Sequence, residues 1–211
     1  MDSNPGFQVS LDVKGRPCLI LGGDDEAADK AQRLLDAGAK VTVVSPTLND
    51  RLRKLTAAAK ILHRGRAFRS TDAQGVVLVI NTLRGDPEFT RSLYELAQHE
   101  RFVLCSVDNL QDSTGMLPAT VARGHLRIAI STSGVAPALA SRLRQDFEQV
   151  FDDRFQAFLE WLADLRKDTQ LGEADAARRR AILRDAVEGF RLQASLDYPK
   201  AWMERETGAQ A

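Results

Sequence analysis

The sequence predicts an α/β protein in which a doubly wound parallel sheet is followed by a helical C-terminal part. Through the first half of the chain, short apolar runs alternate with segments whose apolar residues recur at helical spacing, which is typical of parallel sheets. The first apolar run ends in Gly22-Gly23, and a helical pattern begins directly behind it. Beyond Pro137, apolar residues recur at helical spacing.

The elements of the sheet follow from these patterns. Strands are expected at residues 16–21, 40–45, 61–62, 75–81 and 101–107. Helices are expected between them at residues 25–37, 49–59 and 88–99. The fourth run, GVVLVIN, is the most hydrophobic, so we expect it to be the central strand of the sheet.

The second half of the chain has a different character. Residues 116–121 are short and apolar, and residues 125–131 alternate like a half-buried strand. A helical pattern runs from Pro137 to Leu162, and Asp152-Asp153 is a candidate break within it. Leu183, Val187 and Phe190 predict a further amphipathic helix, and the residues from Glu204 onward are expected to be frayed.

Composition narrows the functional classes. The 211 residues carry 29 basic and 29 acidic side chains, so no overall charge draws the protein to nucleic acid or to a membrane. The apolar runs are too short to span a bilayer, and the N-terminal residues lack the pattern of a signal peptide. Two cysteines and three histidines show no metal-binding spacing, so no metal site is expected. We expect a soluble cytoplasmic protein.

The Gly22-Gly23 turn has two interpretations. In a Rossmann-like fold, glycines between a strand and a helix let backbone N–H groups approach a dinucleotide pyrophosphate. Gly22, Gly23, Asp25 and Glu26 are therefore candidate cofactor-binding residues. Alternatively, this is a plain turn in which Asp24 or Asp25 caps the helix. An Asp24 carboxylate facing a phosphate about 4 Å away would be repelled by roughly 1 kcal/mol in water and roughly 4 kcal/mol at an effective dielectric of 20.

The second expected strand ends at Ser45-Pro46-Thr47, where a Rossmann protein binds the adenosine ribose. No acidic residue stands there to accept the ribose hydroxyls. The hydroxyls of Ser45 and Thr47, or the backbone around Pro46, are the candidates instead. A simple turn at the end of the strand is the alternative.

The ordered motifs resemble the dehydrogenase/chelatase domain of the siroheme synthase family. They are LDVKGRPCLILGG (11–23), LLDAGAKVTVVSP (34–46), VVLVINT (76–82), VDN (107–109), LPATVARGHLRIAISTSG (117–134) and PALASRLR (137–144). The family turn typically reads GGGxVA, and this chain has Asp24 at the third glycine. The resemblance implies a homodimer with an NAD-binding Rossmann domain (residues 1–112), a dimerisation segment (113–150) and a helical C-terminal domain (151–211).

The family oxidises precorrin-2 to sirohydrochlorin with NAD, and some members also insert ferrous iron. The resemblance therefore implies a precorrin-2 dehydrogenase. Two alternatives stay open: a chelatase that inserts iron or cobalt into sirohydrochlorin, and a non-catalytic tetrapyrrole-binding protein that has lost NAD binding. NAD titration distinguishes the last of these, because that protein would bind no cofactor.

Asp108 is the residue to which the resemblance assigns the acid–base role. It follows a predicted strand at the edge where doubly wound sheets bind their ligands. Precorrin-2 oxidation removes a hydride and a proton, and a carboxylate can take the proton. A turn-capping aspartate is the alternative.

The substrate implied by the resemblance carries eight carboxylates, so its site needs cationic and N–H donors. Arg123 flanks the 125–131 strand, and Ser131, Thr132, Ser133 and Gly134 form a polar turn before the following helix. This turn is a candidate nest for a carboxylate. For Arg123 alone, a solvated surface charge is the simpler interpretation.

Overall fold

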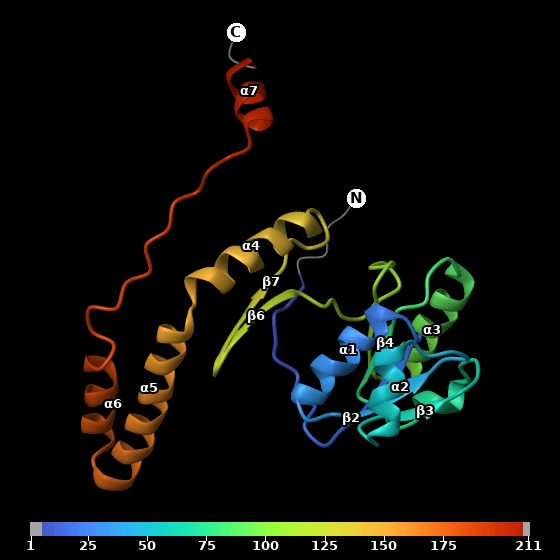
Figure 1. The fold of residues 1–211 in the computed structure, drawn as a ribbon, viewed down its shortest axis with the longest axis horizontal. Helices are drawn as coiled ribbons and strands as arrows, with labels where there is room; N and C mark the ends of the chain where they lie inside the picture. Colours follow the sequence, from blue (N-terminus) through green and yellow to red (C-terminus); the bar gives the residue numbers. More distant parts are fainter. Residues whose placement is uncertain (1–5, 209–211) are drawn as a thin grey trace. The chain divides into compact units, whose positions relative to one another are not determined.

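The computed structural model describes residues 6–208. It contains a five-stranded parallel sheet in the order β3-β2-β1-β4-β5, which confirms the predicted doubly wound sheet (Figure 1). The strands are β1 (Pro17–Leu21), β2 (Lys40–Val44), β3 (Leu62–Arg64), β4 (Leu78–Asn81) and β5 (Val103–Ser106). The middle strand is β1, so the expectation that the hydrophobic GVVLVIN run would be central was wrong; β4 lies beside it.

Helices cover both faces of this sheet because successive side chains of each strand point to opposite sides. The helices are α1 (Asp25–Asp36), α2 (Asp50–Ala57) and α3 (Pro87–Glu100). Ile20 of β1 packs in one buried cluster with residues of α1 and α2, whereas Leu19 and Leu21 pack in a second cluster with Leu93 of α3. Because all the strands are parallel, their carboxyl ends meet at one edge of the sheet.

Several strand boundaries differ from the prediction, those of β3 and β4 among them. Strand β3 begins at Leu62 and continues to Arg64, because Thr42, Val43 and Val44 of β2 provide three register partners. A short 3₁₀ helix, η1 (Ser70–Ala73), follows β3 and was not expected. Strand β4 begins only at Leu78, since the backbone at Gly75 has a positive φ of 71° and turns the chain before the strand.

The second half of the chain forms a two-stranded sheet and four helices. The strands are β6 (Ala119–Arg123) and β7 (Leu126–Ile130), and β6 extends beyond the expected apolar run. The helices are α4 (Pro137–Val150), α5 (Asp153–Gly172), α6 (Ala176–Asp185) and α7 (Lys200–Gly208). The expected break at Asp152-Asp153 is confirmed, with the Asp152 side chain capping α5 through the N–H of Phe155.

Two predictions near the C-terminus were wrong. Helix α6 ends at Asp185, so Val187 and Phe190 lie beyond it, in a turn that closes at Gly189 with φ 79°. Phe190 nevertheless packs on Phe155 and Phe158 of α5. Residues from Glu204 to 208 are helical rather than frayed, as part of α7. Of the expected frayed segment, residues 209–211 lie outside the described residues.

The chain divides into two compact units. One comprises the residues up to Val121 together with Ile128–Glu148, and the other comprises Ala122–Arg127 and the residues from Gln149 onward. The three-part division at residues 112 and 150 remains a prediction. Within the described residues, no helix is both long and apolar enough to cross a membrane.

Candidate cofactor and acid–base site

The Gly22-Gly23 turn is packed tightly between the ends of β2 and β4. A Cβ on Gly22, whose φ is 125°, would lie 2.1 Å from Oγ1 of Thr82, and a Cβ on Gly23 would lie 1.9 Å from the carbonyl oxygen of Thr47. Both distances are far below contact range. Only glycine therefore fits at these two positions, and the turn lies at the carboxyl end of β1, next to the ends of β2 and β4.

Asp24 is the N-cap of α1. Its Oδ1 accepts a hydrogen bond of 2.9 Å from the N–H of Ala27, while its backbone is extended. The capping interpretation is thus observed for Asp24 and not for Asp25. Capping satisfies one of the orphan N–H groups of the first turn and leaves those of Asp25 and Glu26 without a partner inside the helix.

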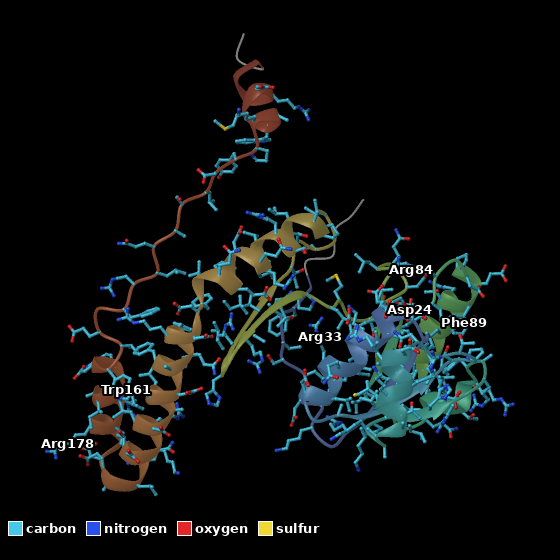
Figure 2. All side chains as sticks on the ribbon, in the orientation of Figure 1. Asp24, Arg33, Arg84, Phe89, Trp161 and Arg178 are labelled. Atoms are coloured by element: carbon cyan, nitrogen blue, oxygen red, sulfur yellow. The ribbon has the colours of Figure 1, made fainter. Side chains whose placement is uncertain are left out.

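The two acids behind Asp24 are also held by polar partners. Asp25 accepts a hydrogen bond of 2.6 Å from the side-chain amide of Asn49, the N-cap of α2. Glu26 pairs with Lys30 one turn along α1, at 3.5 Å, and with Arg84 from the loop after β4. Figure 2 labels Arg84 and Asp24 among the side chains of the protein. The negative charge at the helix N-terminus is therefore partly compensated by two cations.

The end of β2 is brought directly against the glycine turn. Ser45 is buried, and its Oγ lies 2.7 Å from the position of a Cβ on Gly23. The N–H of Asn49 donates to the carbonyl oxygen of Gly23 at 2.7 Å, while Pro46 and Thr47 are exposed. The structure thus gathers the two predicted cofactor segments into one place at the carboxyl edge of the sheet.

Three buried polar residues at the ends of β4 and β5 were missed from the sequence. The hydroxyl of Thr82 donates a hydrogen bond of 2.9 Å to the carbonyl oxygen of Leu21, the residue directly before the glycine turn. Asn81 and Ser106 are register partners, and the Nδ2 atom of Asn81 and the Oγ atom of Ser106 are buried without a hydrogen-bond partner among the described residues. The sequence did carry a signal for these residues, because each of them ends or directly follows an apolar run at the edge where such sheets bind ligands.

Asp108 lies two residues beyond β5, at the same edge of the sheet. It is exposed, and its carboxylate has no hydrogen-bond or ion-pair partner in the described part of the chain. The turn-capping alternative is therefore not what this structure shows. An unpaired carboxylate at this edge is available to a ligand.

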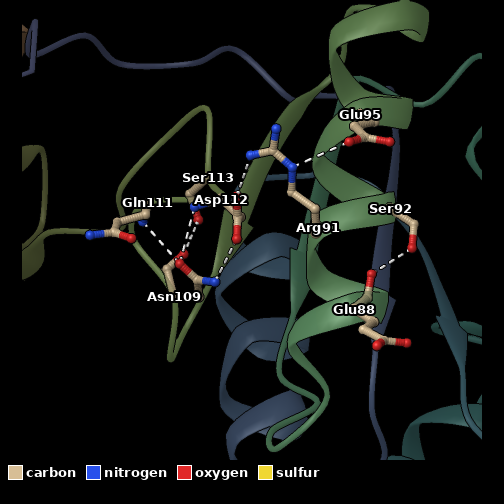
Figure 3. A network of polar contacts seen from close by, with 8 residues as sticks. All are labelled: Glu88, Arg91, Ser92, Glu95, Asn109, Gln111, Asp112 and Ser113. Atoms are coloured by element: carbon tan, nitrogen blue, oxygen red, sulfur yellow. Dashed lines mark hydrogen bonds and ion pairs between the residues drawn. The ribbon is translucent and has the colours of Figure 1, made fainter.

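The loop behind Asp108 is held by a polar network (Figure 3). Oδ1 of Asn109 accepts from the N–H groups of Gln111 and Asp112, each at 3.0 Å, and Asp112 pairs with Arg91 of α3, also at 3.0 Å. The hydroxyl of Ser113 accepts from the N–H of Ser106 at 3.0 Å. This loop covers the free edge of β5 and fixes the backbone that carries Asp108.

A pocket opens beside this loop. It is lined by Glu26, Lys30, Cys105, Ser106, Val107, Leu110, Gly115, Met116 and Leu117. Burial raises the pKa of the Cys105 thiol to about 12 and outweighs the opposing effect of the Lys30 charge, so this cysteine is neutral and behaves as a small apolar residue. Lys30 and Glu26 are the charged groups of the pocket.

The predicted substrate residues fall in different parts of the structure. A Cβ on Gly134 would lie 2.5 Å from Cδ1 of Leu110, so the Ser131–Gly134 turn lies against the loop that follows Asp108. Within the turn, Oγ of Ser131 accepts from the N–H of Ser133 and Oγ1 of Thr132 accepts from that of Ala136. Arg123 belongs to the other compact unit, where its Nε donates to the carbonyl oxygen of Phe151 at 2.8 Å.

These features fit a dinucleotide at the carboxyl ends of β1 and β4: a turn that admits only glycine, first-turn N–H groups without a partner inside the helix, and buried polar atoms without a partner among the described residues. No group of three or more His, Cys, Asp or Glu side chains is arranged to hold a metal ion within residues 6–208.

Comparison with known proteins decides the family. Residues 9–119 match the family described as "Putative NAD(P)-binding", and residues 123–149 match the one described as "Sirohaem biosynthesis protein central". The chain belongs to the siroheme synthase N-terminal family. The predicted resemblance is thereby confirmed, and its first domain is an NAD(P)-binding domain.

Relatives within this family support the assignment. The chain is 32% identical to a siroheme synthase of Methylobacillus flagellatus over 181 residues, covering 86% of this chain and 38% of the relative. It is 37% identical to a siroheme synthase of Neisseria meningitidis serogroup C over 142 residues, covering 67% of this chain and 29% of the relative. The chain thus spans less than half the length of these curated relatives.

A solved structure named SirC, precorrin-2 dehydrogenase, shares the fold over almost the whole chain. It superposes with a TM-score of 0.73 and 22% sequence identity, and covers 97% of this chain and 98% of its own. The likeness therefore extends beyond the parallel sheet to the helical second half.

Proposed function

We propose that this protein is a precorrin-2 dehydrogenase, which oxidises precorrin-2 to sirohydrochlorin with NAD as the hydride acceptor. The observation that carries the proposal is the placement of Asp108. An unpaired carboxylate stands at the same carboxyl edge of the sheet as the glycine turn of an NAD(P)-binding domain. Family membership and the name of the SirC structure supply the substrate.

In this proposal the cofactor binds along the carboxyl edge of the sheet. The first-turn N–H groups of Asp25 and Glu26 hold the pyrophosphate behind Gly22 and Gly23. The adenosine ribose lies at Ser45-Pro46-Thr47, and the absence of an acidic residue there leaves hydroxyl and backbone groups as its partners. Bound NAD supplies hydride acceptance, and the protein orients it and excludes water.

Asp108 takes the proton that leaves precorrin-2. A general base must reach the proton that it abstracts, and an exposed carboxylate on a backbone held by the Asn109–Asp112 hydrogen bonds meets that requirement. The Ser131–Gly134 turn lies against the same loop, through Leu110, and we assign it to binding a substrate carboxylate. Arg123 is assigned to substrate on the family resemblance alone.

The same proposal includes the homodimer and the three-part division at residues 112 and 150 that the family resemblance implies. Within the predicted dimerisation segment, the exposed apolar residues include Val135, Leu139 and Val150. A second copy of the chain is the expected partner for such a surface.

Turnover tests the function directly. The full chain is incubated anaerobically with precorrin-2 and NAD, and NADH and sirohydrochlorin are measured. One NADH per sirohydrochlorin is expected. Tight NAD binding without oxidation would contradict the dehydrogenase, and formation of a metallated product from sirohydrochlorin and ferrous or cobalt ions would indicate the chelatase alternative.

A further inference from the structure

Arg84 links the loop after β4 to the first turn of α1, beside the proposed cofactor site. It belongs to the loop after β4, and its guanidinium pairs with Glu26 in the first turn of α1. Strands β1 and β4 are neighbours from which the chain continues to opposite sides of the sheet, so this ion pair spans the topological switch point. Ligands of doubly wound folds bind at that point.

The residues of the glycine turn carry an excess of negative charge that a bound pyrophosphate would have to overcome. Asp24, Asp25 and Glu26 place three carboxylates beside a position intended for a pyrophosphate, and an approaching dianion is repelled by each of them. Asp24 is engaged by the N–H of Ala27 and Asp25 by Asn49, but neither partner carries a charge. Lys30 and Arg84 are the cations paired with this acidic turn.

The side chain of Arg84 lies at the surface of the protein. Its side chain is 65% exposed, whereas that of Glu26 is 29% exposed. It is followed by Gly85, which has a positive φ of 79° and no atom within 4 Å of its Cβ position. A long side chain on such a loop can change partner without disturbing the core.

We propose that Arg84 is a cofactor-binding residue that exchanges Glu26 for the dinucleotide pyrophosphate when the cofactor binds. Arginine binds phosphate through two parallel N–H donors, and a pyrophosphate carries more negative charge than the single carboxylate of Glu26, which makes it the stronger partner. The exchange offsets the repulsion caused by Asp24 and explains how an acidic turn serves an NAD(P)-binding domain. This inference rests on the proposed cofactor site, but it does not depend on the tetrapyrrole substrate.

The test is a binding series on the full chain with NAD, ADP-ribose and AMP. ADP-ribose contains the pyrophosphate without the nicotinamide, and AMP lacks the pyrophosphate. Arg84→Gln is expected to lower the affinity for NAD and for ADP-ribose by about tenfold each. Its affinity for AMP is expected to fall by less than about twofold. Glu26→Gln frees Arg84 and removes one negative charge, so it is expected to tighten NAD and ADP-ribose.

Arg51→Gln is the matched control. It removes the same charge from an exposed ion pair to the same helix, Arg51 with Asp29 at 2.7 Å, and it is expected to leave ADP-ribose affinity within about twofold. The proposal is overturned if Arg84→Gln binds ADP-ribose as tightly as the wild type does. It is also overturned if Glu26→Gln lowers ADP-ribose affinity as much as Arg84→Gln does. The ion pair would then serve only to stabilise the fold.

Failure of this inference is distinguishable from failure of the proposed function. If the wild type binds ADP-ribose and Arg84→Gln loses it, the inference stands even when precorrin-2 is not oxidised. If precorrin-2 is oxidised and Arg84→Gln keeps wild-type affinity, the inference fails and the function stands.

Discussion

Gly23 leaves no room for a side chain beside Thr47, since a Cβ would lie 1.9 Å from the carbonyl oxygen of that residue. Gly23→Ala is therefore expected to push the turn away from β2, lower the free energy of unfolding by about 1 to 3 kcal/mol and weaken NAD binding. Urea denaturation and NAD titration measure the two effects. Gly172→Ala is the control, because no atom lies within 4 Å of its Cβ position; equal stability of the two variants would contradict the packing described for the turn.

Asp24 stabilises α1 through its bond to the N–H of Ala27. Asp24→Ala should lower the free energy of unfolding by about 1 kcal/mol, while Asp24→Asn should retain most of it, because asparagine caps helices as well as aspartate does. Asp24→Asn should also raise the affinity for NAD several-fold, since it removes a negative charge beside the pyrophosphate. Chemical denaturation and titration of both variants check this, and full stability of Asp24→Ala would show that the cap is dispensable.

Asp72 is buried and holds Arg64 and Arg66 together at the end of β3. The hydrogen bonds from Arg66, the N–H of Arg69 and Arg64, with the charge of Arg66, keep the pKa of this carboxyl far below its usual range despite burial. Asp72→Asn is expected to lower the free energy of unfolding by roughly 2 to 4 kcal/mol at pH 7.

The pH dependence of this effect has a defined sign. Because the folded pKa of Asp72 is depressed, its stabilisation is fully present above the unfolded value of about 4 and is lost as pH falls below it. The stability difference between wild type and Asp72→Asn should thus be constant from about pH 5 upward and shrink in more acidic solution. A difference that grew on acidification would contradict the ion-pair assignment.

Cys18 and Cys105 are predicted to be unreactive in the folded protein. Burial raises their pKa values to about 11 and about 12, so thiolate is scarce near neutral pH. A thiol reagent at pH 8 should modify neither residue until denaturant is added, after which both should react. Rapid modification of Cys105 in the native protein would mean that the pocket it lines is open to the reagent.

Local sequence patterns were enough for most of the parallel sheet, because β1, β2 and β4 are apolar runs followed by segments with helical spacing, whereas β3 is the largely polar segment Leu62–Arg64. Local patterns did not predict the order of the strands within the sheet. The most hydrophobic run, ending at Asn81, lies beside the centre, because burial on both faces is common to β1 and β4. Phe190 misled the helix prediction, since it packs on α5 from a turn rather than from a helix.

The candidate site was predictable only in part. Gly22, Gly23 and Asp108 follow strands directly, so their common edge could be inferred from the fold class. Which carboxylate capped α1, and the pairing of Arg84 with Glu26 across 58 residues of sequence, depend on side-chain geometry that no local pattern encodes.

In the proposed mechanism, Asp108 takes the proton during NAD-dependent oxidation of precorrin-2. The direct measurement is single-turnover oxidation of precorrin-2 by wild type and Asp108→Asn, with NAD affinity measured on the same samples. We expect Asp108→Asn to bind NAD as the wild type does and to form NADH and sirohydrochlorin at least 100-fold more slowly, as loss of a general base does. An unchanged rate at unchanged NAD affinity would contradict the claim.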